Sequence, residues 1–94
     1  MVTYPVHVRR NHYSGSKEGL RLKAARDNRI AGELEEYINK AIEEQNEEEK
    51  IYLYSEIAHE TGYSLDVVHR FLFSVDGGSN GFTVVKKSMD NLER

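Results

Sequence analysis

Residues 54–73 read YSEIAHETGYSLDVVHRFLF and hold the strongest local signals in the 94-residue chain. The first half predicts a short helix that Ser55 caps at its start and that ends at Gly62, since glycine accepts the left-handed conformation that closes a helix. The second half predicts a helix capped by Ser64, with Asp66 in its first turn and an apolar side facing the core. The segment therefore predicts two short helices joined by a tight turn.

The residues on either side of this segment favour strands. Residues 51–53 form a short β-prone run before the first of the two helices. After it, Val75 and residues 82–85 are β-prone and enclose the glycine-rich residues 76–81. Asn80-Gly81 is a strong turn signal because both residue types accept positive φ. We therefore expect a C-terminal β-hairpin with its tip at residues 76–81.

A long helix is expected ahead of these elements, over residues 17–45. Apolar residues recur at spacings of three and four from Ile30 onward, which aligns one apolar face. The pair Asp27 and Asn28 weakens the helix, so we expect a break near residue 27, with one of the two capping the second piece.

Residues 1–16 form an N-terminal basic arm with a weak apolar alternation and a turn around Gly15. The alternation fits a short edge strand, but it fits equally an arm that is unfolded in isolation. Ninety-four residues leave room for one core, so we expect a single domain over residues 17–94.

The segment around the glycine turn resembles the helix-turn-helix unit of DNA-binding proteins. The resemblance lies in a small residue where the helices cross, a turn glycine, an apolar plug and inward-facing apolar residues: Ile57, Ala58, Gly62, Tyr63, Val68 and Phe71. Thr61 departs from the pattern, because an apolar side chain is more usual there. With the flanking β-prone runs, the order resembles a winged helix. The resemblance implies an α+β, mainly α fold: a winged helix-turn-helix with a long N-terminal helix and a C-terminal β-hairpin wing.

The resemblance further implies that the helix starting after Ser64 enters the major groove of DNA. The outward residues that would contact bases or phosphates are Ser64, Leu65, Asp66, His69 and Arg70. Arg70 is the best candidate for a guanine or phosphate contact because its planar fork donates two hydrogen bonds at once. The alternative for Arg70 is a surface ion pair with Asp66, four residues earlier.

Charge is sorted along the chain. Residues 1–31 carry a balance of +5, residues 32–50 of −6 and residues 51–94 of −2. Because phosphate contacts supply most non-specific affinity for DNA, we expect help from cations outside the weakly basic second helix. These are Arg9, Arg10, Lys17, Arg21, Lys23, Lys86 and Lys87. Ser79 and Asn80 at the hairpin tip are further candidates, unless that turn is selected for geometry alone.

Several classes of function lack support in the sequence. The chain has no cysteine, and its four histidines include no pair at the spacing that holds zinc on one helix. No nucleotide-binding loop or nucleophile elbow is present, so we expect neither an enzyme nor a cofactor. No apolar run is long enough to span a membrane, and the first ten residues lack the apolar centre of a signal peptide, so we expect a cytoplasmic protein.

Two hypotheses follow. The first is a sequence-specific reader of double-stranded DNA, a transcriptional regulator or accessory protein of a bacterium or mobile element. The second is a non-enzymatic protein-interaction module on the same scaffold, in which the Glu-rich helix over residues 33–49 docks a partner. Under either hypothesis we expect a homodimer through residues 28–45, because the apolar stripe of the long helix exceeds what one short helix pair would bury.

Overall fold

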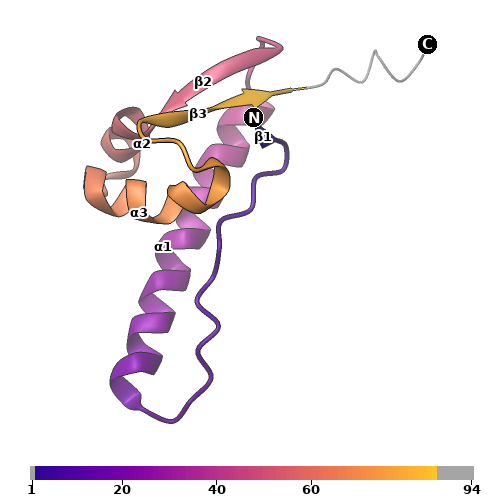
Figure 1. The fold of residues 1–94 in the computed structure, drawn as a ribbon. Coiled ribbons are helices and arrows are strands. Elements are labelled where there is room, and N and C mark those ends of the chain that lie inside the picture. The colour runs from indigo at the N-terminus through magenta and orange to yellow at the C-terminus, as the bar shows by residue number, and fades with distance from the viewer. Residues whose placement is uncertain (1, 87–94) are drawn as a thin grey trace, which may run out of the picture.

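A computed structural model describes residues 2–86 of the chain, which fold into three helices and a three-stranded sheet (Figure 1). The small α+β, mainly helical fold predicted from the sequence is confirmed. The elements in chain order are β1 (Val2–Thr3), α1 (Glu18–Glu43), β2 (Glu49–Leu53), α2 (Tyr54–Thr61), α3 (Leu65–Asp76) and β3 (Gly81–Val85). Within residues 2–86, none of the helices has both the length and the apolar character that a membrane crossing requires.

The core forms where α2, α3 and the sheet pack against the second half of α1. The apolar stripe of α1 is buried inside the monomer, at Ile30, Leu34, Ile38 and Ile42. It meets the inward residues Ile57 of α2, Val68 and Leu72 of α3, and Phe82 and Val84 of β3, all in one cluster. The predicted inner faces of α2 and α3 are thus confirmed. Because the stripe is already covered, the expected dimer through residues 28–45 loses its supporting observation and stays a prediction.

Helix α1 is continuous, so the predicted break near residue 27 is wrong. The two residues expected to interrupt it use their side chains elsewhere. The Asp27 carboxylate accepts a hydrogen bond from Lys23 Nζ at 2.8 Å, one turn earlier, and the Asn28 amide bonds the backbone of Asn11. Asp and Asn weaken helices by competing for nearby backbone groups, and here that competition is absent.

The N-terminal arm lies along α1 in the antiparallel sense (Figure 1). Two asparagines of α1 each bond both backbone groups of one arm residue. Val6 N–H donates to Asn39 Oδ1 at 2.7 Å and Val6 C=O accepts from Asn39 Nδ2 at 2.9 Å, and Asn28 holds Asn11 in the same way. Between them, Val8 N–H donates to Glu35 Oε1 at 2.8 Å.

Apolar contact reinforces this backbone pairing. Val6 and Val8 are only 2% and 3% exposed, while the alternate residues His7 and Arg9 face solvent. Ahead of them, β1 joins the sheet. The predicted alternation holds at Val2, Val6 and Val8 and fails at Tyr4, which is 46% exposed, and the strand lies at Val2–Thr3, ahead of residues 6–8.

Two of the three caps predicted for α2 and α3 are confirmed. Ser64 caps α3, with its Oγ accepting from Val67 N–H at 3.2 Å, and Gly62 ends α2 in the left-handed conformation. The cap predicted at Ser55 is wrong, because α2 begins at Tyr54 and its N-cap is Leu53. A strand runs directly into α2 there, which leaves no loop for a serine cap. Gly77, also left-handed, ends α3.

The sheet has the order β1-β3-β2, with β3 antiparallel to β2 and parallel to β1. The hairpin predicted between Val75 and residues 82–85 is wrong in its first arm, because Val75 belongs to α3. The antiparallel partner of β3 is β2, with Tyr52 opposite Phe82. Residues 77–80 thus connect a helix to a strand.

The turn predicted at Asn80-Gly81 is wrong, because Gly81 does not have a positive φ. Glycine is required at position 81 because the backbones of β2 and β3 approach closely there. In residues 2–86 only Gly62 and Gly77 have positive φ. A Cβ added to Gly81 would lie 2.2 Å from the carbonyl oxygen of Tyr52 in β2. The backbones of β2 and β3 meet there too closely for any side chain.

We expect Gly81→Ala to lower the free energy of unfolding by about 1 to 3 kcal/mol, because β2 or β3 must shift to admit the methyl group. Gly19→Ala is the matched control: a Cβ at Gly19, in the first turn of α1, meets nothing within 4 Å. It should stabilise the protein by up to about 1 kcal/mol through helix propensity and lower entropy of the unfolded chain. Urea unfolding measures both, and equal effects would contradict the proposed close approach.

Candidate nucleic-acid interface

Helix α3, the helix expected to contact DNA, has a buried side and an open side. Its middle is anchored through Val68 and Leu72, which are fully buried. Leu65, Asp66, Arg70 and Phe73 are exposed, and His69 is half-buried. Two clefts of different chemistry lie on either side of α3, one toward α1 and the arm and one toward β2.

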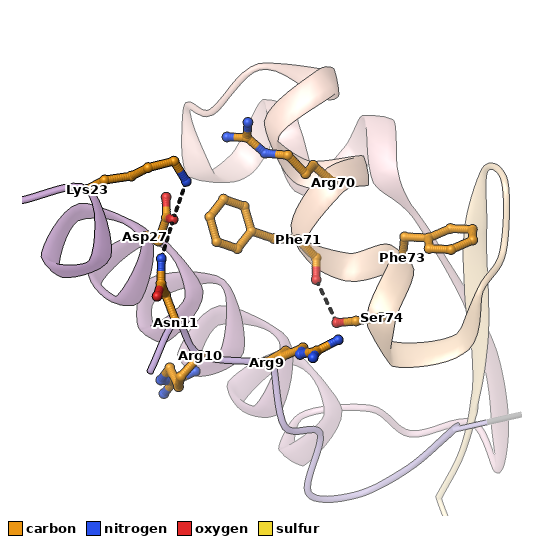
Figure 2. A pocket seen from close by; sticks show the side chains of 9 residues that line it. All are labelled: Arg9, Arg10, Asn11, Lys23, Asp27, Arg70, Phe71, Phe73 and Ser74. Carbon is orange, nitrogen blue, oxygen red and sulfur yellow. Dashed lines mark hydrogen bonds and ion pairs between the residues drawn. The ribbon is translucent and has the colours of Figure 1, made fainter. Parts of the chain in front are cut away.

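The first cleft has a volume of about 380 Å³ and lies between the arm, the first half of α1 and α3 (Figure 2). We call it the basic cleft. Its lining residues are Arg9, Arg10, Asn11, Lys23, Asp27, Arg70, Phe71, Phe73 and Ser74. Four of the predicted DNA-contacting cations thus line one surface, although they come from three separate segments of the chain. Docking of the arm on α1 is what brings them together.

Two of the four cations already have carboxylate partners. Arg10 lies 3.2 Å from Glu35, and Lys23 lies 2.8 Å from Asp27. Arg9 and Arg70 form no ion pair within residues 2–86. The alternative expected for Arg70, a pair with Asp66, is not formed; its guanidinium lies over the ring of Phe71, 5.4 Å from the centroid. Arg9 and Arg70 are therefore the cations available to an anionic ligand.

Figure 2 shows how these groups are arranged around Phe71. The ring of Phe71 points toward α1, Arg70 lies on one side of it and Arg9 on the other, near Ser74. Phe73 points away, toward the opposite side of α3. The basic cleft thus has an apolar centre with a free cation at each end.

Asp27 sets the charge balance in this cleft. The hydrogen bond from Lys23 lowers the pKa of the Asp27 carboxyl, against an opposing effect of burial, and Asn11, the charge of Lys23 and the charge of Arg70 lower the pKa further. The carboxylate is thus held in its charged form, where it fixes the Lys23 ammonium and links the arm to α1 through Asn11 Nδ2 at 3.1 Å.

The second cleft has a volume of about 480 Å³ and lies on the β2 side of α3; we call it the apolar cleft after Leu53 and Leu65, because Arg and Lys are absent from its described lining. Its lining residues are Leu53, Tyr54, Ser55, Leu65, Asp66, His69, Ser79 and Asn80. Five predicted contact residues thus lie together here, apart from Arg70. The His69 imidazole packs edge-on to Tyr54 at 5.4 Å and against Phe73 at 5.7 Å between ring centroids.

The other predicted residues lie outside both clefts. The Ser64 hydroxyl caps α3, and Lys86 Nζ donates to the carbonyls of Glu43 and Gln45, both at 2.9 Å, at the C-terminal end of α1. Lys86 is therefore a helix-capping residue. Lys17 and Arg21 are exposed at the start of α1, far from α3 along the helix (Figure 1). Lys87 lies outside the described residues.

Sequence reasoning missed the residues that assemble the basic cleft. Asn11, Asp27 and Ser74 line it, and Asn28 and Asn39 position the arm. Two asparagines eleven residues apart on one helix face were the available signal, since eleven residues make three helical turns. That spacing predicts no partner by itself, because the arm lies more than fifteen residues away in sequence.

We expect Asp27→Asn to destabilise the protein near neutral pH and to have little effect in acid. A carboxyl whose pKa is lowered by folding adds stability above its unfolded pKa, near 3.9, and that stability is lost as the pH falls through the folded pKa. The difference between parent and variant should therefore shrink below about pH 4. Urea unfolding across this range, with Glu36→Gln on the exposed side of α1 as control, measures it. A difference that persisted unchanged in strong acid would contradict the assigned role of the carboxylate.

Comparisons of the chain with protein-family models, with curated proteins and with solved structures gave no match. The described residues provide two helices, α2 and α3, joined by a turn at Gly62, with the basic cleft on one side of α3 and the apolar cleft on the other.

Proposed function

We propose that this protein binds double-stranded DNA through α3 and the basic cleft, on a scaffold related to the winged helix. The observation that carries the proposal is the meeting of Arg9, Arg10, Lys23 and Arg70 beside the exposed side of α3. The order helix, strand, helix, helix, strand supports the scaffold. In the described residues β1 takes the sheet position beside β3.

Phosphate binding by the basic cleft follows from its charges. Arg9 and Arg70 form no ion pair with a carboxylate of residues 2–86, so their contacts with phosphate break no ion pair there, although the charge of Arg70 also acts on Asp27. Arg10 and Lys23 stay paired and add positive potential around the cleft. The exposed cations of the first half of α1 extend this potential along the helix; they are Lys17, Arg21, Arg26 and Arg29. Each phosphate neutralised releases counterions, so binding should weaken steeply with salt.

The exposed residues of α3 are the ones that contact the bases in this proposal. Arg70 can donate two hydrogen bonds to guanine, Leu65 can contact a thymine methyl group, and Asp66 can accept from the amino group of cytosine. A regulator of a bacterium or mobile element uses such contacts in the cytoplasm, where we place this protein.

Binding of a protein partner is the second candidate function, and the apolar cleft is the observation that favours it. Leu53 and Leu65 are exposed there without a cation beside them. The Glu-rich helix is a weaker candidate for docking than the sequence suggested. Three of its carboxylates are bonded within the monomer: Glu33 to Tyr63, Glu35 to Arg10 and Glu43 to Tyr4.

The experiment is binding of a random duplex pool, followed by sequencing of the retained DNA and by titration of an enriched duplex at several salt concentrations. Arg70→Gln and Arg9→Gln should each weaken binding by about threefold to tenfold and reduce the salt slope by about one, since each removes one phosphate contact. Arg70→Gln should also reduce the preference for one base at the position of the enriched motif that Arg70 contacts.

Lys40→Gln is the matched control, because Lys40 is an exposed cation of α1 outside the basic cleft. It removes the same charge and should leave affinity within about twofold of the parent, because exposed charges beyond a Debye length are screened. If all three variants lost affinity equally, the affinity for DNA would depend on net charge alone and the assignment to the basic cleft would be wrong. If the parent retained no duplex at low salt, the apolar cleft would become the leading site.

A further inference from the structure

The outer edge of β2 is an unpaired strand edge. In the order β1-β3-β2, β2 contacts β3 on one side, and no strand of the described residues lies on the other. Lys86 N–H donates to Glu48 C=O at 2.7 Å and Tyr54 N–H donates to Asn80 C=O at 2.8 Å. Even-numbered residues of β2 therefore direct their backbone groups at β3, and Glu49, Ile51 and Leu53 direct theirs outward.

This edge is also apolar at its centre. Ile51 is 63% exposed, on the face of the sheet opposite the core. Leu53 is exposed on the same face, whereas Tyr52 points inward and is buried. Proteins usually blunt an open edge with charge, proline or a bulge, and β2 has its charged residues, Glu49 and Lys50, only at its start.

We propose that the β2 edge pairs antiparallel with β2 of a second copy of this chain, with the two-fold axis at Ile51. The two Ile51 residues then exchange two hydrogen bonds, and each Leu53 N–H donates to Glu49 C=O of the other copy, which gives four bonds. Leu53 C=O takes no part, because the N-cap residue's carbonyl accepts the first hydrogen bond of α2. The two sheets become one sheet of six strands.

Charge and the Leu53 carbonyl together favour this register over its alternatives. With the axis at Ile51, Lys50 lies opposite Tyr52 of the other copy, so each copy repeats the Lys50 to Tyr52 cation–π contact already present within the chain at 5.3 Å. Glu49 lies opposite Leu53. An axis at Glu49 or at Lys50 would place like charges directly opposite, which is destabilising. An axis at Tyr52 or Leu53 would rely on the Leu53 carbonyl that α2 already uses.

Engineered cysteines test the proposal directly, because the chain has no cysteine of its own. In Ile51→Cys the two sulfurs would face each other across a hydrogen-bonded pair, whose Cα separation near 5.5 Å suits a disulfide. Leu22→Cys on α1 is the control, since Leu22 is 64% exposed and lies away from the sheet. Under mild oxidation Ile51→Cys should form a covalent dimer rapidly, and Leu22→Cys should form one only slowly, by random collision. Equal rates would overturn the proposal.

Sedimentation of the protein without cysteine supplies a second readout. The parent should show a monomer–dimer equilibrium, and Ile51→Lys should weaken it by about tenfold or more because two lysines would face each other at the axis. Leu22→Lys, which adds the same charge, should leave it unchanged. A parent that stayed monomeric at its highest soluble concentration would overturn the pairing. Neither readout involves DNA, so failure here and failure of the proposed function are distinguishable.

Discussion

The hydrogen bonds between the arm backbone and the side chains of Asn28, Glu35 and Asn39, reciprocal at the two asparagines, are the constraint on which the rest of the structure depends. They supply the partners that an extended segment lacks outside a sheet, and each such bond contributes about 1 kcal/mol. They also allow Val6 and Val8 to be buried against the apolar stripe of α1. Without the arm, part of that stripe would face water.

The arm also determines what α3 presents. By holding Arg9 and Arg10 beside α1, it gives the Arg70 side of α3 a set of cations that α3 itself lacks. The opposite side of α3 has Leu65 and His69 with the neighbouring Leu53, and no Arg or Lys of the described residues lines it. A single helix thus separates two different surfaces, and we favour the basic one for nucleic acid because Arg9 and Arg70 form no ion pair within residues 2–86.

Local signals in the sequence predicted local structure well. Ser64, Gly62 and the apolar spacing of α1 act over a few residues, and the structure has the predicted cap, turn and buried face. Predictions that required distant partners were wrong. Asn28 does not break α1 because its partner, Asn11, lies 17 residues earlier, and Gly81 does not form the expected turn because Tyr52, far back in sequence, is what requires it. The basic cleft was missed as a unit for the same reason, since its parts meet only after folding.

The arm and α1 differ in their rise per residue, so they pair only where the same length is covered by different numbers of residues. From Val6 to Asn11 an extended chain advances five residues at about 3.3 Å each, and from Asn39 back to Asn28 a helix advances eleven residues at about 1.5 Å each, so both cover roughly 16.5 Å. The bond between Val8 and Glu35 fits the same scales, because two arm residues cover about 6.6 Å and four helix residues about 6.0 Å. One residue inserted between Val6 and Asn11 would put one asparagine out of step with its backbone partner. The lengths of arm and helix are therefore tied together: each residue added to the arm between its anchors requires about two more in the helix to restore the pairing.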